Sequence, residues 1–227
     1  MYWNEDKRTE DYYISDDIVD LSFAIKCKCL PLEHMQELYE SLSEVLPKLK
    51  NDKFAGIHPI NGAESGNGWV RSNDPTELIY LSRRQKLTLR LPKEFLADAE
   101  NLVGQTIKVA GYDIELGKTS IKKLSDLPTT FCRTIKVDGR MSEDDFLRWA
   151  FDELKALDIS VNKMMAGIER IVILPDNSER VTRSLMIAEM KKEESVKLQQ
   201  HGLGEGRMLG CGIFMPQKDI KAVNSDE

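Results

Sequence analysis

The sequence predicts an α+β fold in which two units with the element order β-α-β-β-α-β follow one another. Two observations lead to this prediction: segments with alternating apolar residues recur between segments with helical spacing, and the complete order occurs twice. Short connections between neighbouring strands favour antiparallel sheets. We expect an acidic tail over residues 1–16, a first unit over 17–117, a linker over 118–129, a second unit over 130–218 and a final tail over 219–227.

The first unit opens with a strand from Asp17 to Cys29, in which apolar and polar residues alternate until Pro31 ends the run. A helix follows, with apolar residues three and four positions apart, and we expect it to begin near Glu33 and to stop at Pro47. The remaining predicted elements are strands over 78–81 and 86–91, a helix over 93–103 and a strand or hairpin over 106–116.

The second unit begins with a strand over Phe131–Val137, and Ser142 is placed to cap the helix that follows. Two strands, over 168–174 and 181–188, flank a turn predicted at Pro175 to Ser178. A helix over 192–200 and a strand over 213–215 complete the unit. This order is that of two ferredoxin-like, or RRM-like, units in tandem.

The composition is that of a globular protein without a membrane anchor. No apolar run approaches the roughly 20 residues that a membrane span needs, and the acidic N-terminus lacks the apolar stretch of a signal peptide. We therefore expect a cytoplasmic protein. The four cysteines show no paired spacing for a metal, so we expect no metal and no cofactor.

The net charge of −6 is unevenly distributed along the chain. Phosphate binding requires cations, so an acidic protein is at first sight a poor nucleic-acid binder. However, the first twenty residues hold seven acids and only two bases, which leaves the rest of the chain near neutral. A local basic patch therefore remains compatible with this composition.

Five glycines lie within the eleven residues from Gly202 to Gly212. Glycine allows positive φ and close approach of another chain, and a run of backbone N–H groups beside a cation such as Arg207 suits a phosphate. The plainer interpretation is a glycine-rich turn between a helix and a strand, but one turn does not require five glycines.

This segment resembles the glycine-rich loop of RNA-binding CRISPR-associated proteins with ferredoxin-like folds, the RAMP superfamily. That pattern is glycine, hydrophobic, glycine, five residues, then glycine, hydrophobic, glycine, and it is intact here at 202–204 and 210–212. The segments Val19–Cys27, Leu30–His34 and Glu194–Gln200 narrow the resemblance to the Cas-six group of endoribonucleases that process precursor crRNA, and to its MYXAN-like subgroup.

The resemblance implies a metal-independent cleavage of CRISPR repeat RNA, in which the 2′-hydroxyl attacks the adjacent phosphate. It also implies a catalytic histidine just after the first strand, where His34 lies, with its role as acid or base left open. His58 is the second catalytic candidate, and His201 begins the glycine-rich segment. For a histidine taken at random, a partly exposed helix residue (His34) or a loop residue bonded to backbone (His58) would be the better interpretation.

Basic residues without neighbouring acids supply the candidates for RNA backbone contacts. In the predicted strand around Lys86 and Arg90, the cations alternate with buried leucines. Arg133 interrupts the apolar side of its own strand, which Phe131, Ile135 and Val137 are expected to share. No row of aromatic residues marks a stacking platform, which favours recognition of the shape and backbone of an RNA hairpin. The predicted RNA-binding residues are Arg83, Arg84, Lys86, Arg90, Arg133, Gly202, Gly204, Arg207, Gly210 and Gly212.

Two other functions remain open at this point. The chain could be a non-catalytic crRNA-binding subunit of an effector complex, with other Cas proteins as partners. It could also be a tandem ferredoxin-like protein that binds a small molecule or a protein and never meets RNA. Cleavage of RNA in the presence of a chelator distinguishes the first interpretation from the second, and salt-sensitive RNA binding distinguishes both from the third.

Overall fold

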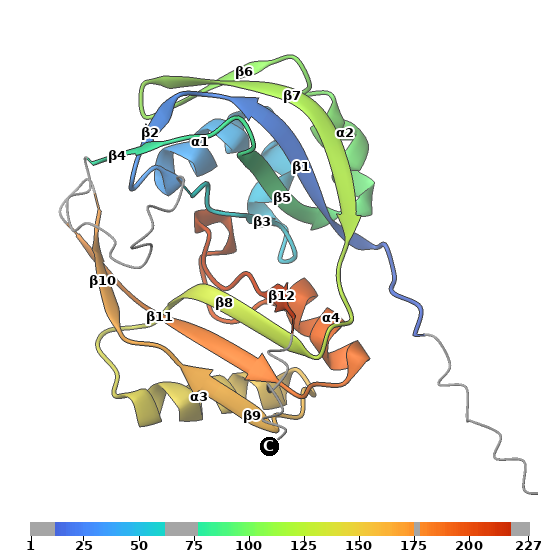
Figure 1. Ribbon diagram of the computed structural model, residues 1–227, viewed down its shortest axis with the longest axis vertical. Helices are drawn as coiled ribbons and strands as arrows, with labels where there is room; N and C mark the ends of the chain where they lie inside the picture. The colour runs from blue at the N-terminus through green and yellow to red at the C-terminus, as the bar shows by residue number, and fades with distance from the viewer. Residues whose placement is uncertain (1–11, 62–76, 175–177, 219–227) are drawn as a thin grey trace, which may run out of the picture.

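The computed structural model describes residues 12–61, 77–174 and 178–218, and it contains two five-stranded antiparallel sheets, one in the upper and one in the lower half of Figure 1. Each sheet packs against helices on one face, and a separate hydrophobic core fills the space between sheet and helices in each half. The predicted α+β fold with tandem ferredoxin-like units is confirmed.

The first sheet has the strand order β3-β5-β1-β7-β6. Its central strand β1 buries Leu21 and Phe23 completely, as the alternating pattern predicts. The sheet and its helices consist of β1 (Ile18–Lys26), α1 (Met35–Val45), β3 (Gly56–Ile57), β5 (Lys86–Pro92), α2 (Leu96–Glu100), β6 (Thr106–Val109) and β7 (Tyr112–Lys123).

A small ladder beside this sheet differs from the prediction. The first strand ends at Lys26, and Cys29 belongs to a separate strand, β2 (Cys29–Pro31). The predicted strand at residue 78 is present as β4 (Leu78–Tyr80), but it pairs with β2 instead of joining the main sheet. Leu30 of this ladder is fully buried and belongs to the core of the first unit.

The second sheet has the order β10-β11-β8-β12, and β9 pairs with the same long strand, β11. Ser142 accepts a hydrogen bond from the Asp145 backbone at the start of α3, so the predicted cap is confirmed. The elements are β8 (Thr129–Lys136), α3 (Glu143–Ala156), β9 (Lys163–Ala166), β10 (Arg170–Ile173), β11 (Glu179–Ala188), α4 (Lys192–His201) and β12 (Met215–Gln217).

Several predicted boundaries are moved by the structure. Residues 118–123, expected in the linker, continue β7, and the connection to β8 is confined to residues 124–128. The last strand begins at Met215, two residues later than expected, because Ile213 and Phe214 do not pair with β8. β10 and β11 form the expected hairpin, although residues 175–177 of its turn lie outside the described residues, as do the tails 1–11 and 219–227.

A β-bulge in β8 changes which residues of that strand face the core. In the pairing of β8 with β11, two residues of β8, Arg133 and Thr134, lie opposite a single residue of β11, Ser184. As a result, Cys132 and Ile135 are buried, whereas Phe131 points to the opposite face. The prediction that Phe131, Ile135 and Val137 share one apolar side is therefore wrong.

Candidate functional site

The glycine-rich segment forms a tight loop between α4 and β12, and all five of its glycines have positive φ. Gly202, which ends α4, has φ 70° and ψ −165°, a conformation that is essentially restricted to glycine. A short 3-10 turn, η3 (Arg207–Leu209), lies between Gly206 and Gly210. The loop closes where the Leu203 backbone donates to Gly212, whose own N–H donates to Thr134 of β8 at 2.8 Å.

The buried side chain of Arg207 connects this loop to the first unit. Its guanidinium donates through Nη2 to the Phe54 carbonyl at 2.9 Å and through Nε to the Ala55 carbonyl at 3.3 Å. The residue is only 8% exposed, and burial lowers its pKa to about 10. Arg207, predicted to contact the RNA backbone, is thus buried, and its side chain connects the two units.

The loop touches the neighbours of two predicted catalytic histidines. η3 packs against β3 and α1. A Cβ at Gly210 would lie 2.7 Å from Cγ of Pro59 and 3.1 Å from Cε of Met35. Pro59 follows His58 and Met35 follows His34, so segments far apart in the sequence meet at one place. The absence of a side chain at Gly210 permits this close approach.

His34 lies at the cap position that begins α1, immediately behind β2. Its Nδ1 donates to the Pro31 carbonyl at 2.8 Å, because a carbonyl oxygen can only accept. In the neutral imidazole this bond selects the tautomer that carries its proton on Nδ1, so that Nε2 is the nitrogen able to accept a proton. The side chain is 2% exposed, so the interpretation of His34 as a partly exposed helix residue is wrong.

His58 belongs to a buried charge cluster. Its Nε2 lies 3.2 Å from Oδ1 of Asp20. Burial lowers the pKa of His58, and although the Asp20 carboxylate acts in the opposite direction, the net shift is downward. Burial alone would raise the pKa of Asp20, but Arg90 and His58 together hold it well below its ordinary value. At neutral pH the cluster therefore contains a neutral imidazole, a carboxylate and a guanidinium.

Arg90 is completely buried at the junction of the two units. It forms a two-bond pair with Asp20, at 2.8 and 2.9 Å, and its Nη1 donates to the carbonyls of Gln199 and Phe214, both at 2.9 Å. The prediction that Arg90 lies on an exposed cationic strip is wrong. The alternation of the strand is as expected, but α4 and the segment before β12 cover this end of the face.

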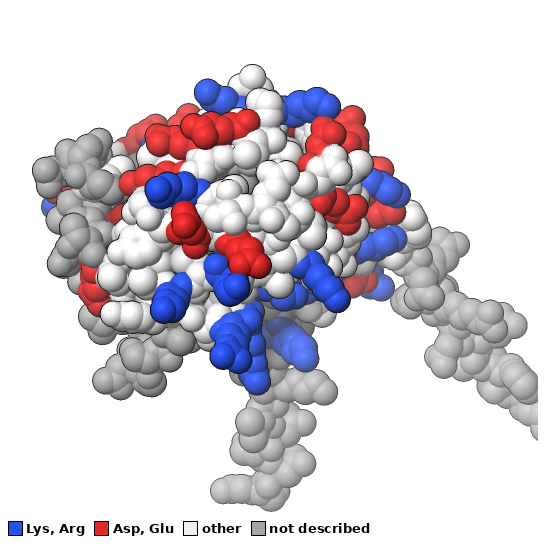
Figure 2. Space-filling model, turned by 90° about the horizontal axis from the view of Figure 1, so that it is seen from above, with Lys and Arg blue, Asp and Glu red and all other residues white. Residues whose placement is uncertain are grey.

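The remaining predicted cations are exposed. Lys86 begins β5 and donates to Oγ of Ser120 at 3.3 Å, Arg83 and Arg84 lie in the turn before it, and Arg133 lies on the bulge of the second sheet. Figure 2 shows that Lys and Arg gather in the lower middle of the face seen there, whereas Asp and Glu form patches along its upper edge and its right side, with further Lys and Arg between them. Charges of opposite sign are thus partly separated.

Sequence reasoning missed two residues of this region, Asp20 and Gln199. Both are polar residues at positions where the sequence pattern predicts the protein surface, but both are buried. Gln199 donates to the backbone of Ser125 and Ser195, which fixes α4 against the connection between the sheets. Only the register of the first sheet, which places Asp20 directly opposite Arg90, could have indicated the pair. His201 packs edge-on against Phe54, at a centroid distance of 5.1 Å.

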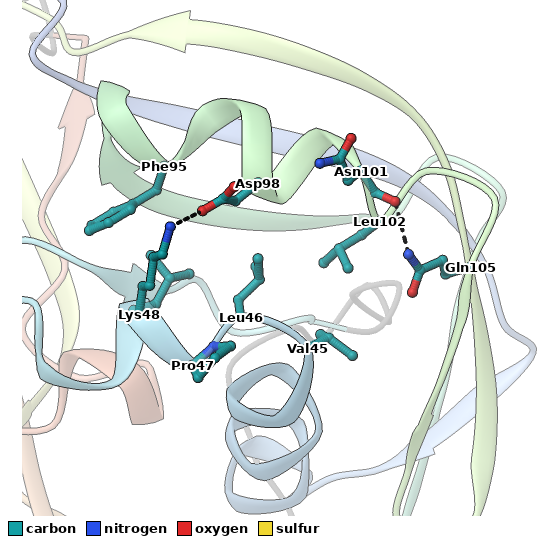
Figure 3. Close-up of a pocket in the computed structure, with 10 residues that line it drawn as sticks. Val45, Leu46, Pro47, Lys48, Phe95, Asp98, Asn101, Leu102 and Gln105 are labelled. Carbon is teal, nitrogen blue, oxygen red and sulfur yellow. Dashed lines mark hydrogen bonds and ion pairs between the residues drawn. The ribbon is translucent and has the colours of Figure 1, made fainter.

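Two hollows of the described surface lie away from this region. One of about 380 Å³ opens between the end of α1 and α2, with the Lys48–Asp98 ion pair (2.8 Å) across it, as Figure 3 shows. Its lining mixes aliphatic and amide side chains and contains no histidine. Among residues 12–61, 77–174 and 178–218, no three His, Cys, Asp or Glu side chains lie close enough together to hold a metal ion, and no helix is long and apolar enough to cross a membrane.

The comparison with family models and the comparison with curated proteins indicate the same family. Residues 19–219 match the family model described as Cas6 Crispr. The chain is 30% identical over 207 residues to the CRISPR-associated endonuclease Cas6 of Myxococcus xanthus (strain DK1622), an alignment that covers 91% of this chain and 85% of that protein.

Solved structures share the fold at low sequence identity. A CRISPR-associated protein Cas6 aligns with a TM-score of 0.61 at 9% identity, covering 88% of this chain and all of that one. A RAMP protein binding different RNA substrates aligns with a TM-score of 0.58 at 13% identity, over 88% and 100% of the two chains. The product of a Cas6-related gene from Pyrococcus furiosus aligns with a TM-score of 0.55 at 12% identity, over 87% and 98%.

Proposed function

Because the chain belongs to the Cas6 family, we propose that it is an endoribonuclease that binds CRISPR repeat RNA and cuts precursor crRNA within the repeats. The observation that carries the proposal is the convergence of the glycine-rich loop with the segments that bear His34 and His58. A cytoplasmic location, and other Cas proteins as further partners, form part of the same proposal.

The proposed reaction is an internal transfer at one phosphate. A base removes the proton of the 2′-hydroxyl, the oxygen attacks the adjacent phosphorus, and the bond to the 5′-oxygen breaks. That oxygen takes up a proton, so the products are a 2′,3′-cyclic phosphate and a 5′-hydroxyl end. Such a reaction needs a positioned acid or base and electrostatic stabilisation of the phosphate, and it needs no metal ion.

His34 is our candidate for the base. Its Nδ1–H is fixed on the Pro31 carbonyl, which leaves Nε2 as the atom that accepts the proton. The imidazole is buried, so the proposal requires the RNA to displace part of what covers it, and the β2–β4 ladder beside it is the short element that could move.

His58 is the weaker candidate. Its ring is bonded to Asp20, and Asp20 is already engaged by Arg90 in the contact between the two units. These bonds give His58 a structural role in the contact between the two units. The exposed Arg83, Arg84, Lys86 and Arg133 remain our candidates for the RNA backbone, with the glycine positions acting through backbone geometry.

The decisive experiment is cleavage of a candidate repeat RNA in the presence of EDTA, with the ends of the products sequenced. His34→Asn is the informative variant, since asparagine is a good helix cap and its amide can still donate to Pro31. We expect cleavage to slow by about 100-fold or more while RNA affinity and melting temperature stay near wild type. His34→Ala should be equally inactive.

The matched comparison is His58→Asn, which we expect to keep its cleavage rate but to lose stability. If His58→Asn is inactive at wild-type stability while His34→Asn cleaves normally, the catalytic histidine is His58. If both variants cleave at the wild-type rate, the histidine mechanism is wrong.

One observation favours a second candidate function, a RAMP-type subunit that binds crRNA without cutting it: the imidazole of His34 is buried. That function predicts salt-sensitive RNA binding with no product in any buffer. A protein that binds a small molecule or another protein would show neither binding nor cleavage.

A further inference from the structure

An apolar row crosses the open face of the second sheet. Met165 of β9 lies directly opposite Met186 of β11, Met186 lies opposite Phe131 of β8, and Phe131 lies opposite Met215 of β12. Residues that lie directly opposite each other have Cβ atoms about 4.5–5.5 Å apart and point to the same face. The four side chains therefore form one continuous line across four strands.

This row faces away from the core. The neighbouring residues Leu185 and Cys132 are buried against the helices on the other face. Met165 is 61% exposed, and Phe131 and Met186 are partly buried. Met215 is 36% exposed and ends the row at the junction of the two units, where its sulfur accepts a hydrogen bond from Nη2 of Arg90 at 3.7 Å. Single exposed apolar residues are normal, but a contiguous line of large ones on an open sheet indicates a binding surface.

Cations lie next to the row on the same face. Beyond Ser184 on β11, the residues Arg170, Thr182 and Lys136 lie directly opposite one another, and Lys136 also forms an ion pair with the exposed Glu205 at 3.2 Å. The bulge in β8 places the exposed Arg133 about 7 Å along the strand from Phe131, the length of two residues. An apolar line bordered by positive charge is complementary to a chain of flat bases joined by phosphates.

We propose that this face binds a single-stranded segment of the RNA, with a base stacked on Phe131 between the methionine side chains and the adjoining phosphates beside Arg133 and Lys136. The proposal deepens the proposed function and rests on it. A single aromatic ring is sufficient here, because flexible thioethers extend the apolar surface on both sides of it. The bordering cations favour RNA over a protein as the occupant.

The test measures binding of a fluorescent 12-nucleotide oligouridylate to the full chain. Phe131→Leu keeps an apolar residue of similar size but removes the ring, whereas Phe131→Tyr keeps the ring. We expect the leucine variant to bind about 10-fold or more weakly, since stacking of one base on an aromatic side chain contributes on this scale. The tyrosine variant should bind like wild type, and both should melt like wild type.

A blunt RNA hairpin of the repeat, without single-stranded ends, separates this proposal from the proposed function. We expect Phe131→Leu to bind and cut that hairpin like wild type. A wild-type protein that binds the oligouridylate through Phe131 but cuts no RNA would contradict the endonuclease and leave the platform intact. Equal oligouridylate binding by wild type and Phe131→Leu would overturn the platform.

Discussion

The pair formed by Arg90 and Asp20 shows how a single side chain connects the two units. Removing two charges from water is costly, and a buried pair is maintained only where further hydrogen bonds satisfy its donors and acceptors. Here Arg90 contacts Asp20 through two bonds and the second unit through the Gln199 and Phe214 carbonyls. The low pKa of Asp20 means that its contribution to stability is present at neutral pH and is lost only as the pH falls well below the ordinary range of a carboxyl, about 4.

Substitution of Arg90 tests this structural role. We expect Arg90→Met to lower the free energy of unfolding by about 3–5 kcal/mol, because it leaves the Asp20 charge buried without its partner. Urea denaturation measures the loss, and the double variant with Asp20→Asn should recover part of it. Lys86→Met, on the same strand but exposed, is the control and should change stability by less than about 0.5 kcal/mol. If Arg90→Met leaves stability unchanged and weakens only RNA binding, our assignment of Arg90 is wrong.

The regular helices and strands were predictable because the pattern of apolar and polar residues that identifies them lies within a short stretch of sequence. The alternation of β1, the capped helix α3 and the β10–β11 hairpin all follow from neighbouring residues. The bulge in β8 was not predictable, because one extra residue is visible only against a partner strand. The burial of Arg90 and Arg207 was missed for a related reason: each is covered by a segment more than 100 positions away. The glycine-rich loop was found from its spacing, whereas its contacts with Pro59 and Met35 required the fold.

The conformation of the glycine-rich loop leads to a prediction with an internal control. Gly202 and Gly139 both have positive φ, but a Cβ at Gly202 would collide with Arg207 and Gly212, whereas nothing lies near a Cβ at Gly139. We expect Gly139→Ala to cost about 1–2 kcal/mol, the penalty for a left-handed residue alone. Gly202→Ala should cost clearly more, because the loop must shift as well. Thermal unfolding of the two variants measures the difference, and equal melting temperatures would show that close packing of the loop is unimportant.

At the scale of the whole molecule, a protein with a net negative charge must concentrate exposed cations on one surface to hold RNA. The net charge is −6, and seven of the acids lie in the first twenty residues. Two predicted cations, Arg90 and Arg207, are engaged in joining the units. Our proposal therefore assigns the contacts with RNA phosphates to the exposed residues Arg83, Arg84, Lys86 and Arg133, together with the basic border of the second sheet.

Salt dependence tests whether these exposed residues contact phosphates. A protein that neutralises phosphates releases bound counterions, so each lost contact reduces the slope of log affinity against log salt concentration by about one unit or less. We expect this reduction for Lys86→Gln and for Arg133→Gln, measured by titrating repeat RNA between about 50 and 200 mM salt. Arg148→Gln is the control, because Arg148 is equally exposed but lies on α3, beside Asp145, on the helical side of the second sheet. If all three variants keep the wild-type slope, RNA is held by some other surface. If Arg148→Gln alone reduces it, the helical side is the one that faces the RNA.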